Sequence, residues 1–158
     1  MADEYVTIAG QRLDVDGAIG AVDLTPLAVG RGGVRGGDLT VETLDGDVPR
    51  GRVRASWNVP LAFNVFGDVD LDGVARSGTR RRQALANVAD LRDLLLAPYT
   101  PGPTIKLVYR LDDGNELEGD VIIGDMPTTA HDDPRIGRVI RIVLDIVVPA
   151  GQLTVVAV

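Results

Sequence analysis

The chain has 158 residues, which suits one domain with a substantial core, and it contains no cysteine. The missing cysteines exclude disulfides, thiol catalysis and cysteine-bound zinc. The formal net charge of −7 argues against a general nucleic-acid-binding surface, which needs excess positive charge to displace counterions. Fifteen of the sixteen basic residues are arginine, which is typical of a GC-rich genome and also suits bidentate ion pairs between subunits.

The first residues, Met1 to Glu4, lack the basic and apolar regions of a secretion signal. No apolar run approaches the ~20 residues of a membrane span. The richest run, 136–148, is interrupted by three charged residues. We therefore expect a soluble protein that is made in a reducing compartment and has no membrane partner.

Residues 5–24 predict a hairpin or strand pair, with turns at Gly10 and Asp16-Gly17. From about 25 to 50 the strand pattern dissolves, because the glycines of 30–37 oppose regular structure through backbone entropy. A short strand is expected inside this region at 39–44. We interpret 25–50 as a long glycine-rich excursion from the core, a kind of segment that is usually functional or disordered.

An unbroken alternation of apolar and polar residues from Val53 to Val65 predicts a long β-strand with one buried face. Residues 68–78 form a polar turn region. Thr79 is placed to cap a helix that runs to about residue 97, where Pro98 ends it. Positions 84, 88, 91 and 95 share one apolar stripe, so the helix is expected to lie on a sheet.

Strands resume after this helix. Two alternating runs, 105–111 and 117–123, flank Asp113-Gly114, which is a strong hairpin signal. A loop over 124–134 leads to a long strand at 136–148, and a short final strand is expected at 153–158. The prediction is one domain, 1–158, that is mainly β: a β-sandwich or open barrel of about seven to nine antiparallel strands with one amphipathic helix at about 79–97.

Signals for catalysis are nearly absent. His131, the only histidine, stands in a His-Asp-Asp-Pro sequence that predicts a turn. Ser56 and Ser77 lack the Gly-x-Ser-x-Gly context of a nucleophile elbow. The glycine-rich loop has Arg35 where the dinucleotide motif needs its last glycine, and no Lys-Ser/Thr pair follows it. We expect neither an enzyme nor a cofactor.

The sequence Asp68-Val-Asp70-Leu-Asp72-Gly73 matches the first half of a calcium-binding loop. The twelfth position, which must supply a bidentate glutamate, is Thr79, and the ninth is Arg76. A solvated acidic turn before the positive end of the helix is the alternative interpretation. The sequence leaves open whether these aspartates bind a cation.

A ligand- or carbohydrate-binding β-sandwich module is a rival to any purely structural role. Such modules usually stack sugars on exposed aromatic rings. Trp57, Phe63 and Tyr109 follow the apolar phase of their strands and are expected in the core. Phe66, which is out of phase, and Tyr99, which follows the helix, are the remaining candidates.

Two stretches, 61–67 (LAFNVFG) and 78–96 (GTRRRQALANVADLRDLLL), precede an Asp-Gly hairpin and a long closing strand. In this order the chain resembles the ring-forming tail proteins of long-tailed bacteriophages over most of its length. The resemblance implies a structural virion protein that is assembled in the host cytoplasm. It implies hexameric rings, in a tail tube or a distal-tail ring, around a channel for the genome and a tape-measure protein. DNA would pass this channel without specific binding.

A ring subunit must meet its neighbours through strand edges, because unpaired backbone groups invite partners and closed symmetry satisfies them. A negative channel lining would repel DNA phosphates. The candidates for contacts between subunits or rings are Arg31, Arg35, Arg50, Arg52 and Arg54. The candidates for acidic residues that face the channel are Asp68, Asp70, Glu118 and Asp120.

Overall fold

The computed structural model describes residues 4–29, 34–35, 40–43, 46–49, 53–54, 56–96, 104–133 and 137–156. The helices within them are α1 (Thr25–Val29) and α2 (Arg80–Leu95). The strands are β1 (Tyr5–Ile8), β2 (Gln11–Arg12), β3 (Ile19–Gly20), β4 (Val34–Arg35), β5 (Thr40–Thr43), β6 (Gly46–Pro49), β7 (Val53–Arg54), β8 (Trp57–Val65), β9 (Ile105–Arg110), β10 (Glu116–Asp125), β11 (Thr128–Asp133), β12 (Gly137–Val148) and β13 (Thr154–Val156). Neither helix has the length and apolarity that a membrane span requires.

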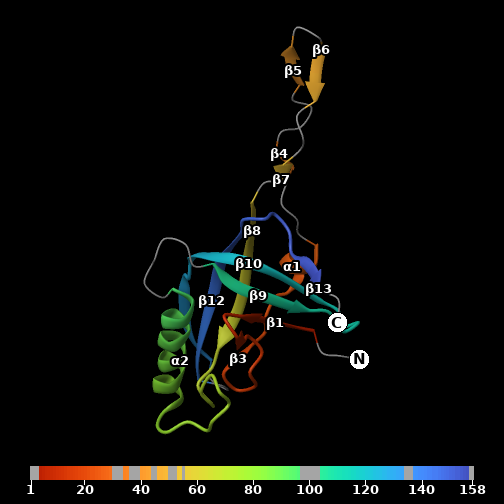
Figure 1. The fold of residues 1–158 in the computed structure, drawn as a ribbon. Coiled ribbons are helices and arrows are strands. Elements are labelled where there is room, and N and C mark those ends of the chain that lie inside the picture. The colour runs from red at the N-terminus through yellow and green to blue at the C-terminus, as the bar shows by residue number, and fades with distance from the viewer. Residues whose placement is uncertain are drawn as a thin grey trace.

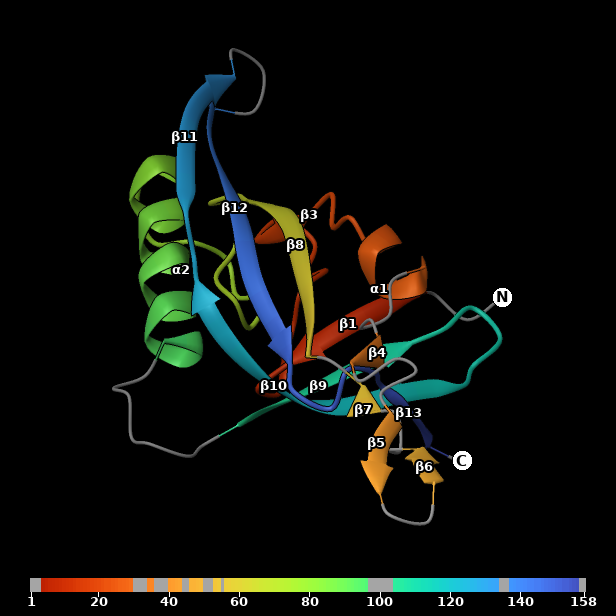
Figure 2. The same ribbon diagram turned by 90° about the horizontal axis from the view of Figure 1, so that it is seen from above.

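Nine antiparallel strands form one curled sheet, a half-barrel with α2 at its side (Figure 1). The strand order is β2-β1-β9-β10-β12-β8-β3, with β13 beside β10 and β11 beside β12. Figure 2 shows β12 between β8 on one side and β10 with β11 on the other. Strand β10 changes partners along its length: residues 116–121 pair with β9, whereas the part from Ile122 onward pairs with β12, across a register shift between Ile123 and Asp125. This fold confirms the predicted fold class.

The longest strands alternate as the sequence predicts. In β8 the odd-numbered residues from Trp57 to Val65 are buried, and in β12 the even-numbered residues from Ile140 to Val148 are buried. Four apolar residues of α2 join the same core, and they are the predicted stripe: Ala84, Val88, Leu91 and Leu95. Burying each large apolar side chain contributes about 1.5–3 kcal/mol, so this shared core is what holds the helix on the sheet.

Helix α2 is attached to the end of β8 by specific contacts. The backbone N–H of Arg82 donates to Oγ1 of Thr79 at 3.3 Å, so Thr79 is the predicted N-cap. Asn87 is fully buried, and its side-chain amide donates to the carbonyls of Phe66 and Val69, each at 2.9 Å. A β-carbon at Gly67 would lie 1.9 Å from the carbonyl oxygen of Arg80, so only glycine allows the helix to come this close.

Two short ladders lie between α1 and β8 in the sequence, and Figure 1 shows them beyond the start of β8. Strand β4 pairs with β7, and β5 pairs with β6. The strand predicted at 39–44 is confirmed by β5. The prediction that 30–37 holds no regular structure is wrong for β4, because pairing with β7 supplies hydrogen bonds that a glycine-rich segment lacks alone.

Three further predictions need correction. The single strand expected from Val53 to Val65 is two strands, β7 and β8, and Ser56 belongs to neither. The loop expected over 124–134 contains the end of β10 and all of β11, so His131 lies in a strand, opposite Val139, rather than in a turn. Strand β12 extends beyond the residues that pair with β10. Strand β11 forms hydrogen bonds with the backbone of that extension. Helix α1, which no pattern indicated, places Leu27 in the core.

Candidate functional site

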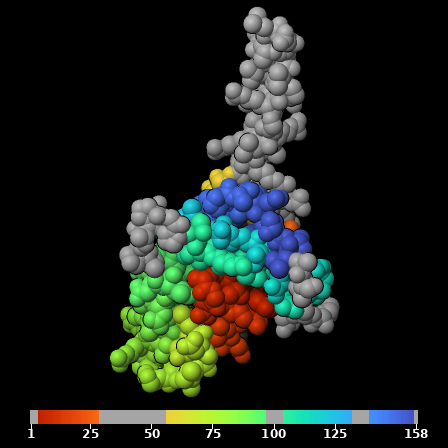
Figure 3. All heavy atoms as spheres, in the orientation of Figure 1, coloured from red at the N-terminus to blue at the C-terminus, as the bar shows by residue number. Residues whose placement is uncertain are grey.

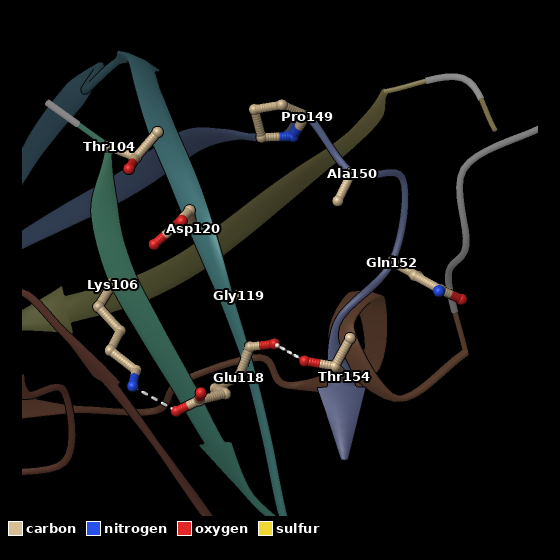
Figure 4. Close-up of a pocket in the computed structure, with 9 residues that line it drawn as sticks. All are labelled: Thr104, Lys106, Glu118, Gly119, Asp120, Pro149, Ala150, Gln152 and Thr154. Carbon is tan, nitrogen blue, oxygen red and sulfur yellow. Dashed lines mark hydrogen bonds and ion pairs between the residues drawn. The ribbon is translucent and has the colours of Figure 1, made fainter. Parts of the chain in front are cut away.

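A shallow hollow of about 470 Å³ lies on the outer side of the sheet, over β9, β10 and the turn that joins β12 to β13 (Figure 4). Figure 3 shows the surrounding face, where the N-terminal segment borders residues of β9 and β10 and, beside them, C-terminal residues. The residues that line the hollow are Thr104, Lys106, Glu118, Gly119, Asp120, Pro149, Ala150, Gln152 and Thr154. Two of the acidic residues predicted to face a channel, Glu118 and Asp120, are therefore neighbours on one strand.

The β9–β10 hairpin places these side chains. Its turn is the predicted Asp113-Gly114, in which Gly114 has a φ of +88° that L side chains rarely adopt. The carboxylate of Asp113 accepts hydrogen bonds from the backbone N–H and the side-chain amide of Asn115, both at 2.8 Å. The backbone bond, with help from the amide, lowers the pKa of Asp113 below its ordinary value of 3.8.

Two of the three charged residues that line the hollow, Lys106 and Glu118, are paired within the chain. The ammonium of Lys106 forms an ion pair with Glu118, and the register also places Asp120 opposite Lys106. The hydrogen bond to Glu118 raises the pKa of Lys106 above its ordinary value of 10.5. The hydroxyl of Thr154 donates to the backbone carbonyl of Glu118 at 3.1 Å, which ties β13 to β10 (Figure 4).

Glycine at 119 shapes the floor of the hollow. A β-carbon there would lie 2.8 Å from Cδ2 of Leu153, so a larger residue would require the Leu153 side chain to move. The hollow is open, and of its charged residues Lys106 and Asp120 are exposed and Glu118 is half-buried. Such an arrangement can contact a polar surface, and the described residues bring no three histidine, aspartate or glutamate side chains together as metal ligands.

The other two predicted channel residues, Asp68 and Asp70, lie elsewhere, in the turn between β8 and α2. The carboxylate of Asp68 contacts Arg76 at 3.0 Å and Arg80 at 2.5 Å. Oδ1 of Asp70 accepts the backbone N–H groups of Asp72 and Val74, at 3.0 and 2.8 Å. These carboxylates therefore shape the turn, and the structure does not bring them together with Glu118 and Asp120.

Only some of the arginines predicted to contact a neighbour lie within the described residues. Arg35 belongs to β4 and Arg54 to β7, in a ladder that pairs Arg35 with Val53 and Arg54 with Val34. Arg31, Arg50 and Arg52 lie outside the described residues, as does Tyr99. Of the aromatic residues, Trp57, Phe63 and Tyr109 are buried as predicted, and Phe66 is half-buried against Gly20.

A second hollow, of about 410 Å³, was not indicated by the sequence. It opens between α1 and the edge strand β13, and six of the eight residues that line it are apolar: Leu27, Ala28, Trp57, Leu117, Leu153 and Val155, with Gln152 and Thr154. Val155 is 68% exposed at its rim. Its walls come from segments that are far apart in the sequence, so only tertiary structure could reveal it.

Comparison of the chain with protein families and with curated proteins finds no match.

Proposed function

We propose that this chain is a structural subunit of a long-tailed bacteriophage tail, and that it assembles into rings, of which the hexamer is the expected form. The rings would belong to a distal-tail structure or a tail tube and would enclose the channel for genome passage. The observation that carries the proposal is the curled sheet that does not close on itself. A half-barrel leaves strand edges that must be covered, and copies arranged in a closed ring cover these edges without any other partner.

Strand β13 is the edge through which we propose that a neighbour binds. In the described part of the chain β13 pairs with β10 on one side only. Its central residue, Val155, is the most exposed large apolar side chain among those described, and it lies at the rim of the second hollow. A strand added at this edge would gain backbone hydrogen bonds, and its side chains would fill the hollow.

In such a ring, the face of β9 and β10 would line the channel. It presents the carboxylates of Glu116, Glu118 and Asp120 in line along β10, with Lys106 and Arg110 beside them. A lining of paired charges with an acidic excess would repel phosphates and bind DNA weakly. The excursion with Arg35, together with the strand β7 that follows it and carries Arg54, would then reach an adjacent subunit or ring.

Negative-stain electron microscopy of the purified chain tests this proposal. We expect rings with a central hole. Long hollow tubes at high concentration would indicate a tube protein, whereas single or double rings would indicate a distal-tail ring. Val155→Lys places a charge on the edge of β13 and should abolish rings without unfolding the subunit. Leu85→Lys is the matched control, because Leu85 is 51% exposed on α2, away from this edge.

Charge reversal of Arg52 and Arg54 tests the role of the excursion. We expect folded subunits that fail to stack or assemble, and unaltered rings or tubes would contradict this role. A uniform monomer of the wild-type chain at high concentration would overturn the ring proposal. Binding to a polysaccharide array by such a monomer would instead favour the rival carbohydrate-binding module.

A further inference from the structure

The strands β8 and β12 have a second face, opposite the one that packs on α2 and the core. We call it the outer β8–β12 face. It includes alternate residues of these strands and two residues of β10: Asn58, Pro60, Ala62, Asn64, Arg141, Val143, Asp145, Val147, Ile122 and Asp125. Arg141, Asp145 and Ile122 are exposed, Ile122 by 42%, so solvent reaches this face.

Two apolar pairs lie on the outer β8–β12 face, with Asp145 between them on β12. The register places Val143 opposite Ala62, and Val147 opposite Ile122. Single exposed apolar side chains are ordinary on protein surfaces. Here, however, they adjoin one another on neighbouring strands, with charged residues among them. Apolar residues with polar groups around them are typical of surfaces that bind another protein.

The polar groups on this face lack partners within the part of the chain that the structure describes. Arg141 and Asp145 form no ion pair or hydrogen bond there, although both are exposed. Asp145 lies opposite Asp125 on β10, and like charges opposite each other on a sheet are destabilising. The side-chain oxygen of Asn64 is buried without a hydrogen-bond donor.

We propose that the outer β8–β12 face binds the same face of a second copy of this chain across a two-fold axis. Arg141 and Asp145 stand two residues before and two residues after Val143 on the same face of β12. A two-fold axis between the faces, at right angles to β12 and over Val143, places each Arg141 above the partner's Asp145. Val143 of both copies then meets at the centre, and two ion pairs form at once.

A second copy fits this face better than an unrelated partner because the pattern is self-complementary. An isologous contact requires that each residue find its partner on an identical surface. One positive and one negative group at equal distances from an apolar centre meet this requirement. Faces of packed sheets lie ~10 Å apart, which an arginine side chain can bridge to a carboxylate. The contact does not depend on the ring of the proposed function, since it uses a face and not an edge.

Variants with exchanged charges test this contact. Sedimentation at increasing protein concentration measures the mass of each variant in solution and so its association. Each variant is made in a chain that also carries Val155→Lys. This substitution removes the proposed ring contact, so any association that is left can be assigned to the outer β8–β12 face. In that background we expect a dimer. Either single reversal, Arg141→Glu or Asp145→Arg, should weaken it at least about tenfold, because it sets like charges together twice. The double variant Arg141→Glu/Asp145→Arg should restore the dimer.

The matched control is Arg81→Glu, which makes the same charge change on α2 and should leave the dimer intact. Circular dichroism checks that each variant is folded. Ile122→Lys gives a second test, because this exposed position tolerates a lysine in the folded subunit. It places a charge beside Val147 on the same face, and it should also weaken the dimer.

A monomer of the Val155→Lys variant at all concentrations would overturn the inference, as would single reversals or an Ile122→Lys variant that dimerises like its parent. If both single reversals abolish the dimer and the double variant does not restore it, the two-fold geometry is also overturned. Wild-type rings together with a monomeric Val155→Lys variant would reject this contact and keep the ring proposal. Dimers of the wild-type chain that never form rings would reject the ring proposal and keep the contact through the outer β8–β12 face.

Discussion

The two outer faces of the curled sheet differ in whether their charged side chains are paired within the subunit. On the face of β9 and β10, Arg110 pairs with Glu116 at 3.0 Å and Lys106 pairs with Glu118, so cations and carboxylates neutralise one another within the subunit. On the outer β8–β12 face, Arg141 and Asp145 have no such partner among the described residues. The first face can therefore remain in water, as a channel lining would, whereas the second gains most from meeting another surface.

The largest effect is expected from the core that both faces share. Leu144 of β12 is fully buried, directly beside Val143 in sequence but on the other side of the sheet. Leu144→Ala should lower the free energy of unfolding by about 2–5 kcal/mol, through lost burial and a new cavity. Urea denaturation measures this loss. A change below about 1 kcal/mol would mean that the core of β8 and β12 is not packed as described.

Gly67→Ala should have the next largest effect, because it separates α2 from the sheet. The added β-carbon would meet backbone atoms of Arg80 and Ala84, which cannot rotate away. We expect a loss of about 1–3 kcal/mol or more in unfolding free energy, with the helix displaced. Gly73→Ala is the control, because a β-carbon there meets nothing within 4 Å, although its φ of +80° adds some strain. Equal losses in the two variants would contradict the close approach of the helix.

Val143→Ala separates folding from association. Val143 is half-buried on the outer β8–β12 face, so the monomer should lose less than about 1 kcal/mol. If this face binds a second copy, the dimer should weaken although the subunit remains folded. Sedimentation and urea denaturation of the same variant measure the two effects. A large loss of monomer stability with unchanged association would show that Val143 belongs to the core.

The face of β9 and β10 should respond to alkaline pH. Because the pKa of Lys106 is raised in the folded state, its pairing with Glu118 stabilises the fold fully below pH 10.5 and is lost as pH rises through the folded-state pKa. Lys106→Met removes this dependence. The effect is small because the pair is exposed. Thermal melting curves above and below pH 10.5 compare the two proteins, and parallel pH profiles would contradict the pairing.

The smallest effect is expected at the hairpin turn. The pKa of Asp113 is lowered, so its contribution is present above pH 3.8 and is lost as pH falls through the folded-state pKa. Asp113→Asn should therefore lose less stability than the wild type on going from neutral pH to below pH 3.8. Asp112→Asn serves as the neighbouring control. The same acid response in both variants and the wild type would show that the turn does not depend on this carboxylate.

Elements with a clear pattern of side chains among neighbouring residues can be predicted from the sequence alone. The alternation in β8 and β12, the capped helix after Thr79 and the Asp113-Gly114 turn each depend on a few neighbouring residues, because side-chain periodicity and backbone φ preferences act over short distances. For the same reason the alternation of their strands is enough to place Trp57, Phe63 and Tyr109 in the core, where the fold has them.

Long-range contacts decide which of these elements meet. Strand β11 forms at His131 because β12 extends beyond its pairing with β10, and no local pattern encodes that unpaired length. The acidic residues predicted to face one channel likewise lie in two separate places. Asp68 forms ion pairs with Arg76 and Arg80, whereas Glu118 forms one with Lys106. The side of β12 that carries Arg141 and Asp145 is fixed by its alternation, but whether those charges find partners depends on every strand folded around them.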